Sequence, residues 1–287
     1  MADHPSMHLE PHTQTKLNAC REILADLGSV VVAFSAGVDS TFLVALAAET
    51  LGGRNVLAAM GVSPSLAARE RHQGRELARL IGIELVEVET GELSDPNYAS
   101  NPANRCFYCK KDLFGRLANL AAERGFLAVA SGANADDIGD FRPGLEAGRQ
   151  MGVRNPLLEA TLTKEEIRAA SRAMGLPTWD KPSSACLASR VPYGQPLTAP
   201  RLSRIEKAED ILKDLGFRQC RVRDHDTLAL IEVEAEDIYK AARLRRSIVS
   251  AFVALGYNYV ALDLKGFRSG SMNEVLLGRT PRGPSGS

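Results

Sequence analysis

A short run of small and hydroxyl-bearing residues follows an apolar stretch near the start of the chain. The apolar residues 30–34 are typical of a buried parallel strand, and residues 35–41 are too small and polar for a core. From position 41 apolar residues recur with helical spacing, so the run leads from a strand into a helix. Backbone N–H groups and the helix dipole at such a corner attract anions. The sequence therefore predicts a phosphate-binding loop containing Ser35, Gly37, Val38, Asp39, Ser40 and Thr41.

This loop would hold phosphate differently from a Walker A loop, because no lysine follows its glycine. Its donors are backbone amides and the hydroxyls of Ser35, Ser40 and Thr41. Asp39 can hold Mg²⁺, which would neutralise phosphate charge, or it can accept from a loop amide. The pattern resembles the S-[GA]-G-x-D-S signature of the ATP pyrophosphatase (PP-loop) superfamily, whose members cleave ATP between the α and β phosphates. Ala36 stands where glycine is usual, which matters if that residue needs a positive φ.

Five cysteines in a chain without a secretion signal indicate metal-binding or catalytic thiols before disulfides. Cys106 and Cys109 form a C-x-x-C motif, which fits zinc, an iron–sulfur cluster or a redox dithiol. A third cysteine, Cys186, lies in a loop with no neighbouring motif to supply a fourth zinc ligand. Three thiolates favour a [4Fe–4S] cluster with one open iron, while zinc and unliganded thiols stay as alternatives. Cys20 and Cys220 fit buried positions of a helix and a strand.

Glycine and polar residues also lie where two other predicted strands end. Gly61 ends a strand at 55–62, where it leaves room for an adenine ring, although a plain strand end explains it equally well. Gly132 opens the loop after the next candidate strand. This loop offers four side chains that can bind Mg²⁺, orient ATP or solvate a turn, namely Asn134, Asp136, Asp137 and Asp140. Its position favours contacts of Asn134 and Asp136 with the nucleotide.

Several arginines lie close to Cys186 in sequence or in the segments after it. Arg190 can lower the pKa of the Cys186 thiol and so increase the thiolate fraction. Arg221 and Arg223 alternate on one face of a predicted strand, where both can point at a phosphate, although a solvated strand face explains them nearly as well. Two further arginines fit a solvated helix surface better than a site, namely Arg201 and Arg204.

A parallel sheet is needed to bring the groups of the first half of the chain together. The patterns there follow βαβαβ order, which implies right-handed crossovers and a ligand crevice at the carboxyl ends of the strands. The predicted fold class is therefore α/β. Strands are predicted at 30–34, 55–62, 83–89 and 126–131, and helices at about 14–27, from 41, and at 65–81, 109–124 and 163–174. The last of these helices begins with a capping box from Thr163 to Glu166.

Prolines and a glycine between 177 and 200 indicate a domain boundary. Beyond it, the patterns predict a small α+β domain with its helices on one face of a short sheet. Its helices are predicted at about 199–215 and 236–254, and its strands at 219–224, 227–234 and 257–263. The predicted organisation is a disordered N-terminus at 1–13, an ATP-binding domain at 14–180, the cysteine loop with the small domain at 181–278, and a disordered tail at 279–287.

The overall composition excludes some classes of partner. The 35 basic and 35 acidic residues balance, which argues against nucleic acid or an anionic membrane as a partner. No apolar run approaches the roughly 18–20 residues of a membrane span. Residues 1–15 lack the apolar core of a signal peptide. We therefore expect a cytoplasmic protein.

Five segments together resemble the LarE family of ATP-dependent sulfur transferases, over nearly all of residues 14–278. They are FSAGVDSTFL, NRCFYCK, SGANADDIGDFRPGLEA, SSACLASRVPYG and LKGFRSGSMNEVLLG. The resemblance implies a PP-loop domain, a smaller C-terminal domain and a homo-oligomer, which is a hexamer in members of the family. It also implies that ATP adenylates the carboxylates of a pyridinium mononucleotide and that sulfur displaces AMP. The thiocarboxylate product leads to the nickel-pincer nucleotide cofactor of lactate racemase.

The resemblance also assigns roles to individual residues. In one branch of the family a single cysteine, matching Cys186, gives up its own sulfur. In the other branch three cysteines hold a [4Fe–4S] cluster that carries sulfide from an external source, and Cys106, Cys109 and Cys186 match that branch. The substrate phosphate would be contacted by Ser189, Arg190, Arg221 and Arg223. Glu209 would line the site near the cysteine, with Glu206 one helical turn away as the alternative.

Two other functions remain open from the sequence. A tRNA thiolase of the same superfamily can also combine a PP-loop with three cysteines, but the neutral charge and the lack of an RNA-binding module argue against it. A regulatory protein that binds ATP without chemistry would leave the C-x-x-C motif and Cys186 unexplained. A structural zinc protein is a third reading, which metal analysis would decide.

Overall fold

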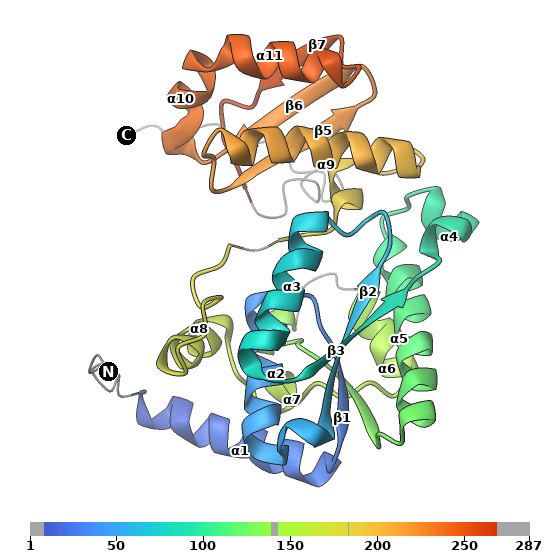
Figure 1. Cartoon of the computed structure of the whole chain (residues 1–287), viewed down its shortest axis with the longest axis vertical. Helices are drawn as coiled ribbons and strands as arrows, with labels where there is room; N and C mark the ends of the chain where they lie inside the picture. Colours follow the sequence, from blue (N-terminus) through green and yellow to red (C-terminus); the bar gives the residue numbers. More distant parts are fainter. Residues whose placement is uncertain (1–8, 139–142, 183, 269–287) are drawn as a thin grey trace. The chain divides into compact units, whose positions relative to one another are not determined.

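The computed structural model describes residues 9–138, 143–182 and 184–268 (Figure 1). These residues form two compact units, which we call unit 1, up to Ser184, and unit 2, from Ala185. Predictions for residues 1–8, for Asp140, for the motif residues 269–278 and for the tail at 279–287 fall outside the described residues. No helix in the described part of the chain is long and apolar enough to cross a membrane.

Unit 1 contains the predicted parallel sheet. Its strands are β1 (Val30–Ala33), β2 (Val56–Val62), β3 (Glu84–Glu89) and β4 (Ala128–Ser131), in the order β3-β2-β1-β4. All three pairings are parallel, so the α/β prediction is confirmed. Every residue of β1 is buried, as expected for a central strand covered on both faces. The phosphate loop and the loop after β4 therefore leave neighbouring strands at the same edge of the sheet.

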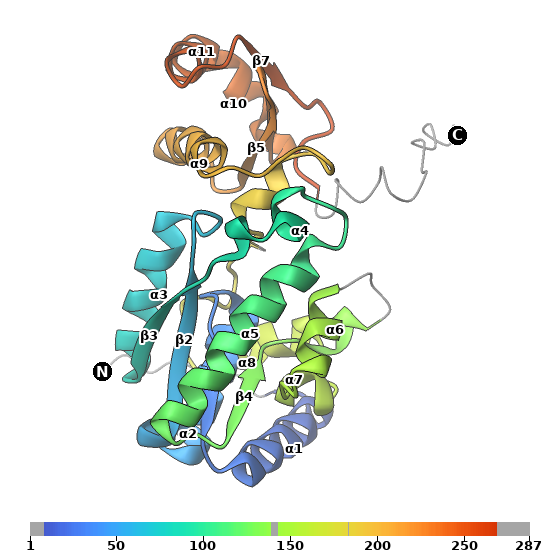
Figure 2. The ribbon, with the colours of Figure 1, turned by 90° about the vertical axis from the view of Figure 1, so that its right-hand side faces the viewer.

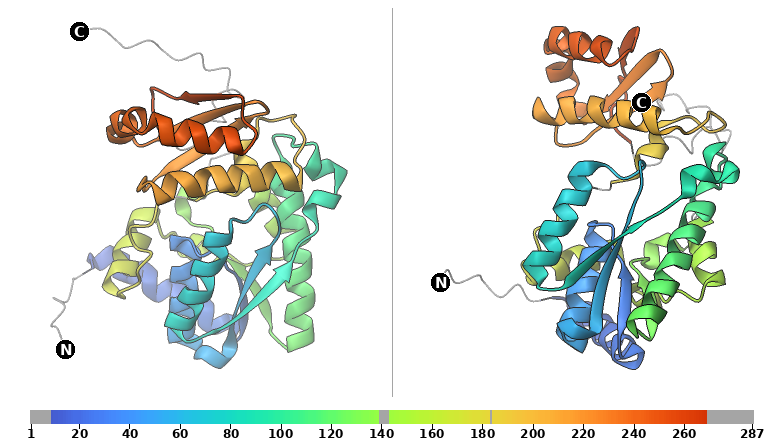
Figure 3. Two further views of the ribbon diagram at one scale, coloured as in Figure 1. Left: turned by 45° about the horizontal axis from the view of Figure 1, so that its top comes forward. Right: turned by 45° about the vertical axis from the view of Figure 1, so that its right-hand side comes forward.

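Helices cover both faces of this sheet (Figures 1 and 2). On one face Val30 and Val32 pack with α1, α2, α3 and α8, and on the other Val31 and Ala33 pack with α5. Figure 3 shows α3 and α5 on opposite sides of the strands. The helices of unit 1 are α1 (Pro11–Leu27), α2 (Val38–Leu51), α3 (Ala68–Ile81), α4 (Pro96–Ala99), α5 (Arg105–Arg124), α6 (Pro143–Gln150), α7 (Pro156–Glu159) and α8 (Lys164–Ala173).

Some helix boundaries differ from the prediction for local reasons. Helix α1 begins at Pro11, within the stretch predicted to be disordered, because proline is well suited to a first helical turn. The same property begins α4, α6 and α7, which the sequence analysis missed. Helix α5 begins at Arg105, so it includes the whole C-x-x-C motif instead of starting at its second cysteine. Helix α2 begins at Val38, which places Asp39 and Ser40 in its first turn.

Unit 2 is built on a mixed three-stranded sheet. Strands β5 (Cys220–His225) and β6 (Leu228–Val233) are antiparallel, and β7 (Tyr259–Leu262) pairs parallel with β6. Its core contains Val222, Ile231 and Phe252, so one face of the sheet is covered by α9 (Ala199–Asp214), α10 (Ile238–Arg243) and α11 (Arg245–Ala254). This confirms the predicted small α+β arrangement. The single helix predicted at 236–254 is divided at Leu244 into α10 and α11.

Candidate active site

The phosphate loop (residues 35–41) is closed by its own serines. The Ser40 hydroxyl accepts from the Ser35 backbone N–H at 3.2 Å and lies 3.1 Å from the Ser35 Oγ. Gly37 is the N-cap of α2 and provides no side-chain cap, so the N–H groups of the first turn keep their capacity to donate. Thr41 is fully buried, which leaves Ser35 as the exposed hydroxyl among the three predicted donors. The corner is suited to an anion.

Ala36 adopts the left-handed conformation that favours glycine. Its φ is +56° and its side chain is fully buried. A non-glycine residue in this region costs about 1–2 kcal/mol, so the departure from the usual glycine has a physical consequence. The Ala36 carbonyl accepts a hydrogen bond from Lys181 Nζ at 2.9 Å. The strained residue is therefore held by a charged donor from a distant part of unit 1.

Asp39 has one paired and one unpaired carboxylate oxygen. Its Oδ2 forms an ion pair with Lys164 Nζ, at the start of α8. Its Oδ1 is buried and has no hydrogen-bond partner among the described residues. An unpaired buried carboxylate oxygen is costly in free energy, and Mg²⁺ prefers such oxygen ligands. The site therefore fits the predicted Mg²⁺, with Asp39 as a ligand.

Lys164 connects the phosphate loop with the loop after β4. Its side chain pairs with Asp39, and its backbone N–H donates to Asp136 Oδ2 at 2.8 Å. Asn134 caps the short helix that follows it, accepting from the Asp136 N–H at 3.0 Å. The two loops are thus brought together as predicted, but Asn134 and Asp136 are engaged in local hydrogen bonds. Their direct contact with a nucleotide stays a prediction.

The two predicted glycines lie where a side chain would collide with a neighbour. A Cβ on Gly132 would come within 3.0 Å of the Ser40 backbone nitrogen, so a side chain there would displace the first turn of α2. A Cβ on Gly61 would come within 3.0 Å of a methyl of Leu113, a residue of α5. Gly132 thus permits close packing of the two loops. The space beside Gly61 is occupied by a core leucine, which gives this glycine a packing role.

The cysteines divide into exposed and buried groups. Cys106 is exposed and Cys109 half-buried, three residues apart on one face of α5, and Cys186 is exposed in unit 2. Burial raises the pKa of both Cys20 and Cys220 to about 12, which confirms them as core residues. In the described part of the chain, no three His, Cys, Asp or Glu side chains gather as a metal site. Within unit 1, two of the proposed cluster ligands lie side by side on one helix face.

In unit 2, Arg190 is fixed by a buried carboxylate. Its Nε and Nη2 donate to the two oxygens of Glu209 at 2.7 and 2.9 Å, and both side chains are almost fully buried. Its Nη1 donates to the Cys186 carbonyl at 3.1 Å and to the Ser189 hydroxyl at 3.0 Å. Arg190 therefore holds the backbone around Cys186. Glu206, the alternative to Glu209, is only half-buried.

Arg223 and Arg221 lie on the face of β5 opposite the helices. Arg223 forms a two-point ion pair with Glu232 at 3.0 and 2.9 Å and donates to the Ser189 carbonyl at 2.6 Å. The Arg221 guanidinium stacks 4.5 Å from the ring centre of Phe267. No described residue accepts a hydrogen bond from Arg221. Burial, with the nearby charges of Arg190 and Arg223, lowers the pKa of Arg221 to about 10, so it stays cationic at neutral pH.

These side chains form what we call the arginine cluster: Arg190, Arg221 and Arg223 with Glu209 and Glu232. All five are at most 6% exposed. Three guanidinium groups face two carboxylates, so one positive charge is left uncompensated within the cluster. Arg221 is the member that carries it. The cluster is therefore suited to bind an anionic group.

The interpretation of Arg201 and Arg204 as solvated helix residues was wrong. Both form ion pairs at 2.7 Å with Asp224, which is fully buried. The Tyr257 hydroxyl donates to the same carboxylate at 2.9 Å, and Arg204 stacks 4.4 Å from the Tyr257 ring centre. A buried carboxylate needs such partners, and they are supplied by the helix that packs on its strand. These arginines hold α9 against β5.

Comparison with known proteins assigns the chain to a family. No model of a known protein family matches it. The pyridinium-3,5-bisthiocarboxylic acid mononucleotide synthase of Lactiplantibacillus plantarum is 37% identical over 253 residues, which is 88% of this chain and 92% of that protein. This chain belongs to the LarE family.

Two further relatives share most of the length of this LarE-family chain. An uncharacterized protein of Synechocystis sp. is 41% identical over 265 residues, covering 92% of this chain and 98% of that protein. An uncharacterized protein of Methanocaldococcus jannaschii is 25% identical over 240 residues, covering 84% and 91%. The similarity thus spans both units of the LarE-family fold.

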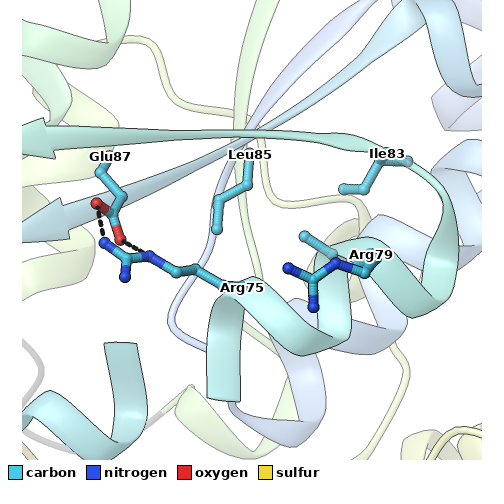
Figure 4. Close-up of a pocket in the computed structure, with 6 residues that line it drawn as sticks. Arg75, Arg79, Ile83, Leu85 and Glu87 are labelled. Atoms are coloured by element: carbon cyan, nitrogen blue, oxygen red, sulfur yellow. Dashed lines mark hydrogen bonds and ion pairs between the residues drawn. The ribbon is translucent and has the colours of Figure 1, made fainter. Parts of the chain in front are cut away.

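A surface pocket of this LarE-family chain lies apart from all predicted site residues. It lies between α3 and the edge strand β3 (Figure 4). Glu87 accepts two hydrogen bonds from Arg75 at 2.8 Å, and hydrogen bonds from Arg71 and then Arg75 lower the pKa of Glu87 to about 2. Its lining is formed by Arg75, Ala78, Arg79, Ile83, Leu85 and Glu87. The polar groups here pair with one another, so the pocket adds nothing to the site.

The sequence analysis missed two lysines of this LarE-family site. Lys164 follows the capping threonine of α8, and Lys181 lies just before the cysteine loop. Lys164 contacts Asp39, and Lys181 contacts the Ala36 carbonyl. The capping box signalled the start of α8, but it was read only as a helix boundary. A lysine in the first turn of a helix is electrostatically unfavourable there, and that conflict was a usable signal.

Proposed function

We propose that this LarE-family enzyme uses ATP to insert sulfur into pyridinium-3,5-biscarboxylic acid mononucleotide. The product is the thiocarboxylate form, which serves the biosynthesis of the nickel-pincer nucleotide cofactor of lactate racemase. The observation that carries the proposal is the near full-length identity of 37% with a synthase of the bisthiocarboxylic acid mononucleotide. The phosphate loop with its uncapped helix start and the positively charged arginine cluster support it.

The phosphate loop activates a substrate carboxylate. Backbone N–H groups at Gly37, Val38 and Ser40 donate to the phosphates of ATP, together with Ser35. Asp39 holds the Mg²⁺ through its unpaired oxygen, and Lys164 then turns from Asp39 to the phosphates. A carboxylate oxygen of the substrate attacks the α-phosphorus, the bond to the β-phosphate oxygen breaks, and pyrophosphate leaves. The acyl adenylate has AMP as a good leaving group.

The arginine cluster binds the phosphate of the mononucleotide. Arg221 has no hydrogen-bonded acceptor in the described part of the chain, so its guanidinium can donate to a phosphate without losing another bond. Arg223 and Arg190 are already fixed by Glu232 and Glu209, which orients their remaining donors. Ser189 lies between them, bonded to both arginines through its carbonyl and hydroxyl. We infer that Glu209 acts through Arg190.

Three cysteines supply the site of sulfur transfer. We infer that Cys106, Cys109 and Cys186 hold a [4Fe–4S] cluster, because a set of three thiolates leaves one iron open. When bound, that cluster offers a position for sulfide as the sulfur donor. The exposure of Cys106 and Cys186 and the pairing of Cys106 with Cys109 on one helix face support this. In the alternative, Cys186 itself gives up its sulfur and each chain acts once.

A metal analysis separates these two modes. Protein purified without oxygen is assayed for iron, zinc and acid-labile sulfide, beside the Cys106→Ala variant. Roughly four irons per chain with matching sulfide, lost in the variant, support the cluster. Zinc in place of iron would make the three cysteines structural. Absence of both metals after anaerobic reconstitution would make Cys186 a sacrificial donor, and its mass would fall by one sulfur during turnover.

The function itself is tested by mass spectrometry. The protein is incubated without oxygen with MgATP, sulfide and pyridinium-3,5-biscarboxylic acid mononucleotide. We expect pyrophosphate release that depends on the mononucleotide, and a product in which sulfur has replaced a carboxylate oxygen. Pyrophosphate release that instead depends on tRNA would favour a tRNA thiolase. We further expect a cytoplasmic homo-oligomer that receives sulfide from a separate donor.

A further inference from the structure

The Lys181 side chain connects the end of unit 1 with the phosphate loop. Its Nζ donates to the Ala36 carbonyl at 2.9 Å, to Glu70 Oε2 at 2.5 Å and to Gln73 Oε1 at 2.6 Å. The side chain is only 13% exposed. An ammonium group has three donors, so these three acceptors use all of them. Lys181 is therefore fixed in one place by unit 1 alone.

The contact with Ala36 meets the loop at its strained residue. Ala36 is fully buried with a φ of +56°, and the next residue, Gly37, caps α2. The orientation of the Ala36 carbonyl fixes the plane of the peptide that leads into that cap, because the peptide bond is planar. A charged donor on this carbonyl thus stabilises the conformation that alanine disfavours.

The backbone that carries Lys181 is also held in place. Arg168, in α8, donates to the Trp179 carbonyl at 2.7 Å and to the Lys181 carbonyl at 2.8 Å. The Ser184 hydroxyl donates to Glu70 Oε1 at 3.3 Å, so the same α3 carboxylate receives both ends of the segment. Cys186 follows Ser184 by two residues along the chain. The segment that leads to the cysteine is therefore anchored to the phosphate loop and to α3.

We propose that Lys181 is a positioning residue for ATP binding, which keeps the phosphate loop in its phosphate-binding form through the Ala36 carbonyl. The proposal rests on the proposed function only in that the loop binds MgATP. It makes a distinctive prediction about position 36. A glycine there would adopt the left-handed conformation without strain, so the loop would depend much less on Lys181.

The test is a double-mutant cycle on MgATP affinity, measured by calorimetry on the full chain. Lys181→Met removes the charged hydrogen bond and should weaken MgATP binding roughly tenfold. Adding Ala36→Gly to this variant should restore most of the lost affinity, while Ala36→Gly alone should change it little. Lys16→Met is the matched control, because Lys16 also pairs with a glutamate of unit 1 but contacts Glu166 on α8. It should leave MgATP affinity unchanged.

The outcomes are distinguishable. Unchanged MgATP affinity in Lys181→Met overturns the proposal, and so does a loss that Ala36→Gly does not rescue, since that would mean a general structural role. Lys181→Gln keeps a donor in the same place and should lose less affinity, and it decides the matter if the methionine variant does not fold. Wild-type protein that binds no MgATP contradicts the proposed function itself, whereas normal binding without sulfur transfer leaves the role of Lys181 intact.

Discussion

The phosphate loop of unit 1 and the arginine cluster of unit 2 are both suited to anions, but they are built from different groups. The loop uses backbone N–H groups at an uncapped helix start, with one buried carboxylate oxygen that lacks a partner. The cluster uses three buried guanidinium groups, two of which are fixed by glutamates. The loop is therefore completed by its ligands, whereas the cluster is largely complete before a ligand binds.

This difference has an energetic reason. Backbone donors at a helix start point outward without further support, so a loop of small residues is enough to form a phosphate site. Three buried arginines would repel one another, and two carboxylates compensate most of that charge. The cluster thus depends on unbroken ion pairs for its stability. Substitutions should consequently affect ligand binding in the loop and both folding and binding in the cluster.

The largest effect is expected from breaking the cluster. Arg190→Met leaves Glu209 buried without a partner, which should destabilise unit 2 by about 3–5 kcal/mol. Urea unfolding followed by circular dichroism measures it. Arg245→Met is the control, because Arg245 is exposed at the start of α11, and its change should stay within about 0.5 kcal/mol. Equal stability of the two variants would show that the cluster is not held by this pair.

A large effect on binding, with little effect on folding, is expected in the loop. Asp39→Asn removes the charge that holds Mg²⁺ and should weaken MgATP binding by roughly 10- to 100-fold. Thermal stability should stay near that of the wild type, because the carboxylate already has one unpaired oxygen. Calorimetry with and without Mg²⁺ measures the binding. The exposed Asp26→Asn variant should behave as the wild type, and an equal loss there would contradict the assignment.

A smaller effect is expected at the one arginine without an ion pair. Arg221→Lys keeps a positive charge but loses the planar group that stacks on Phe267 and donates twice to a phosphate. The KM for the mononucleotide should rise about tenfold while the KM for ATP stays constant. In the wild type, affinity for the mononucleotide should fall as pH rises through about 10, where Arg221 loses its proton. An altered KM for ATP would contradict this division of roles.

The smallest effect concerns thiol reactivity in the folded protein. Burial raises the pKa of Cys20 and Cys220 to about 12, so at pH 8 almost none of either is thiolate. Metal-free protein treated with iodoacetamide should therefore be modified at the exposed Cys106 and Cys186 and stay unmodified at the two core cysteines. Peptide mass spectrometry after brief treatment measures it. Early modification of Cys220 would show that the core of unit 2 opens easily.

Much of the fold could be predicted, because its strands and longer helices have clear periodic patterns. The apolar run of β1 and the capping box of α8 are local signals, and both are confirmed. Short helices such as α4 were missed because four residues give no period to detect. The division of the helix at 236–254 also has no clear sequence signal, since Leu244 is an ordinary helix-forming residue.

The site could be predicted only where its residues are close together in sequence. The phosphate loop is one continuous motif, so its residues were found, and a known family pattern identified Arg221 and Arg223. Lys164 and Lys181 were missed because their partners Asp39 and Ala36 lie far away in sequence. Asp224 lies on β5, away from the helix that carries Arg201 and Arg204, so their role could not be seen from spacing alone.

The most direct test of the account measures pyrophosphate and thiocarboxylate in parallel for Cys186→Ala, with MgATP, sulfide and the mononucleotide. The account assigns adenylation to the phosphate loop and sulfur transfer to the cysteine. It predicts that the variant binds MgATP and releases a burst of pyrophosphate, yet forms no thiocarboxylate. Undiminished thiocarboxylate, or loss of MgATP binding together with pyrophosphate release, would contradict it.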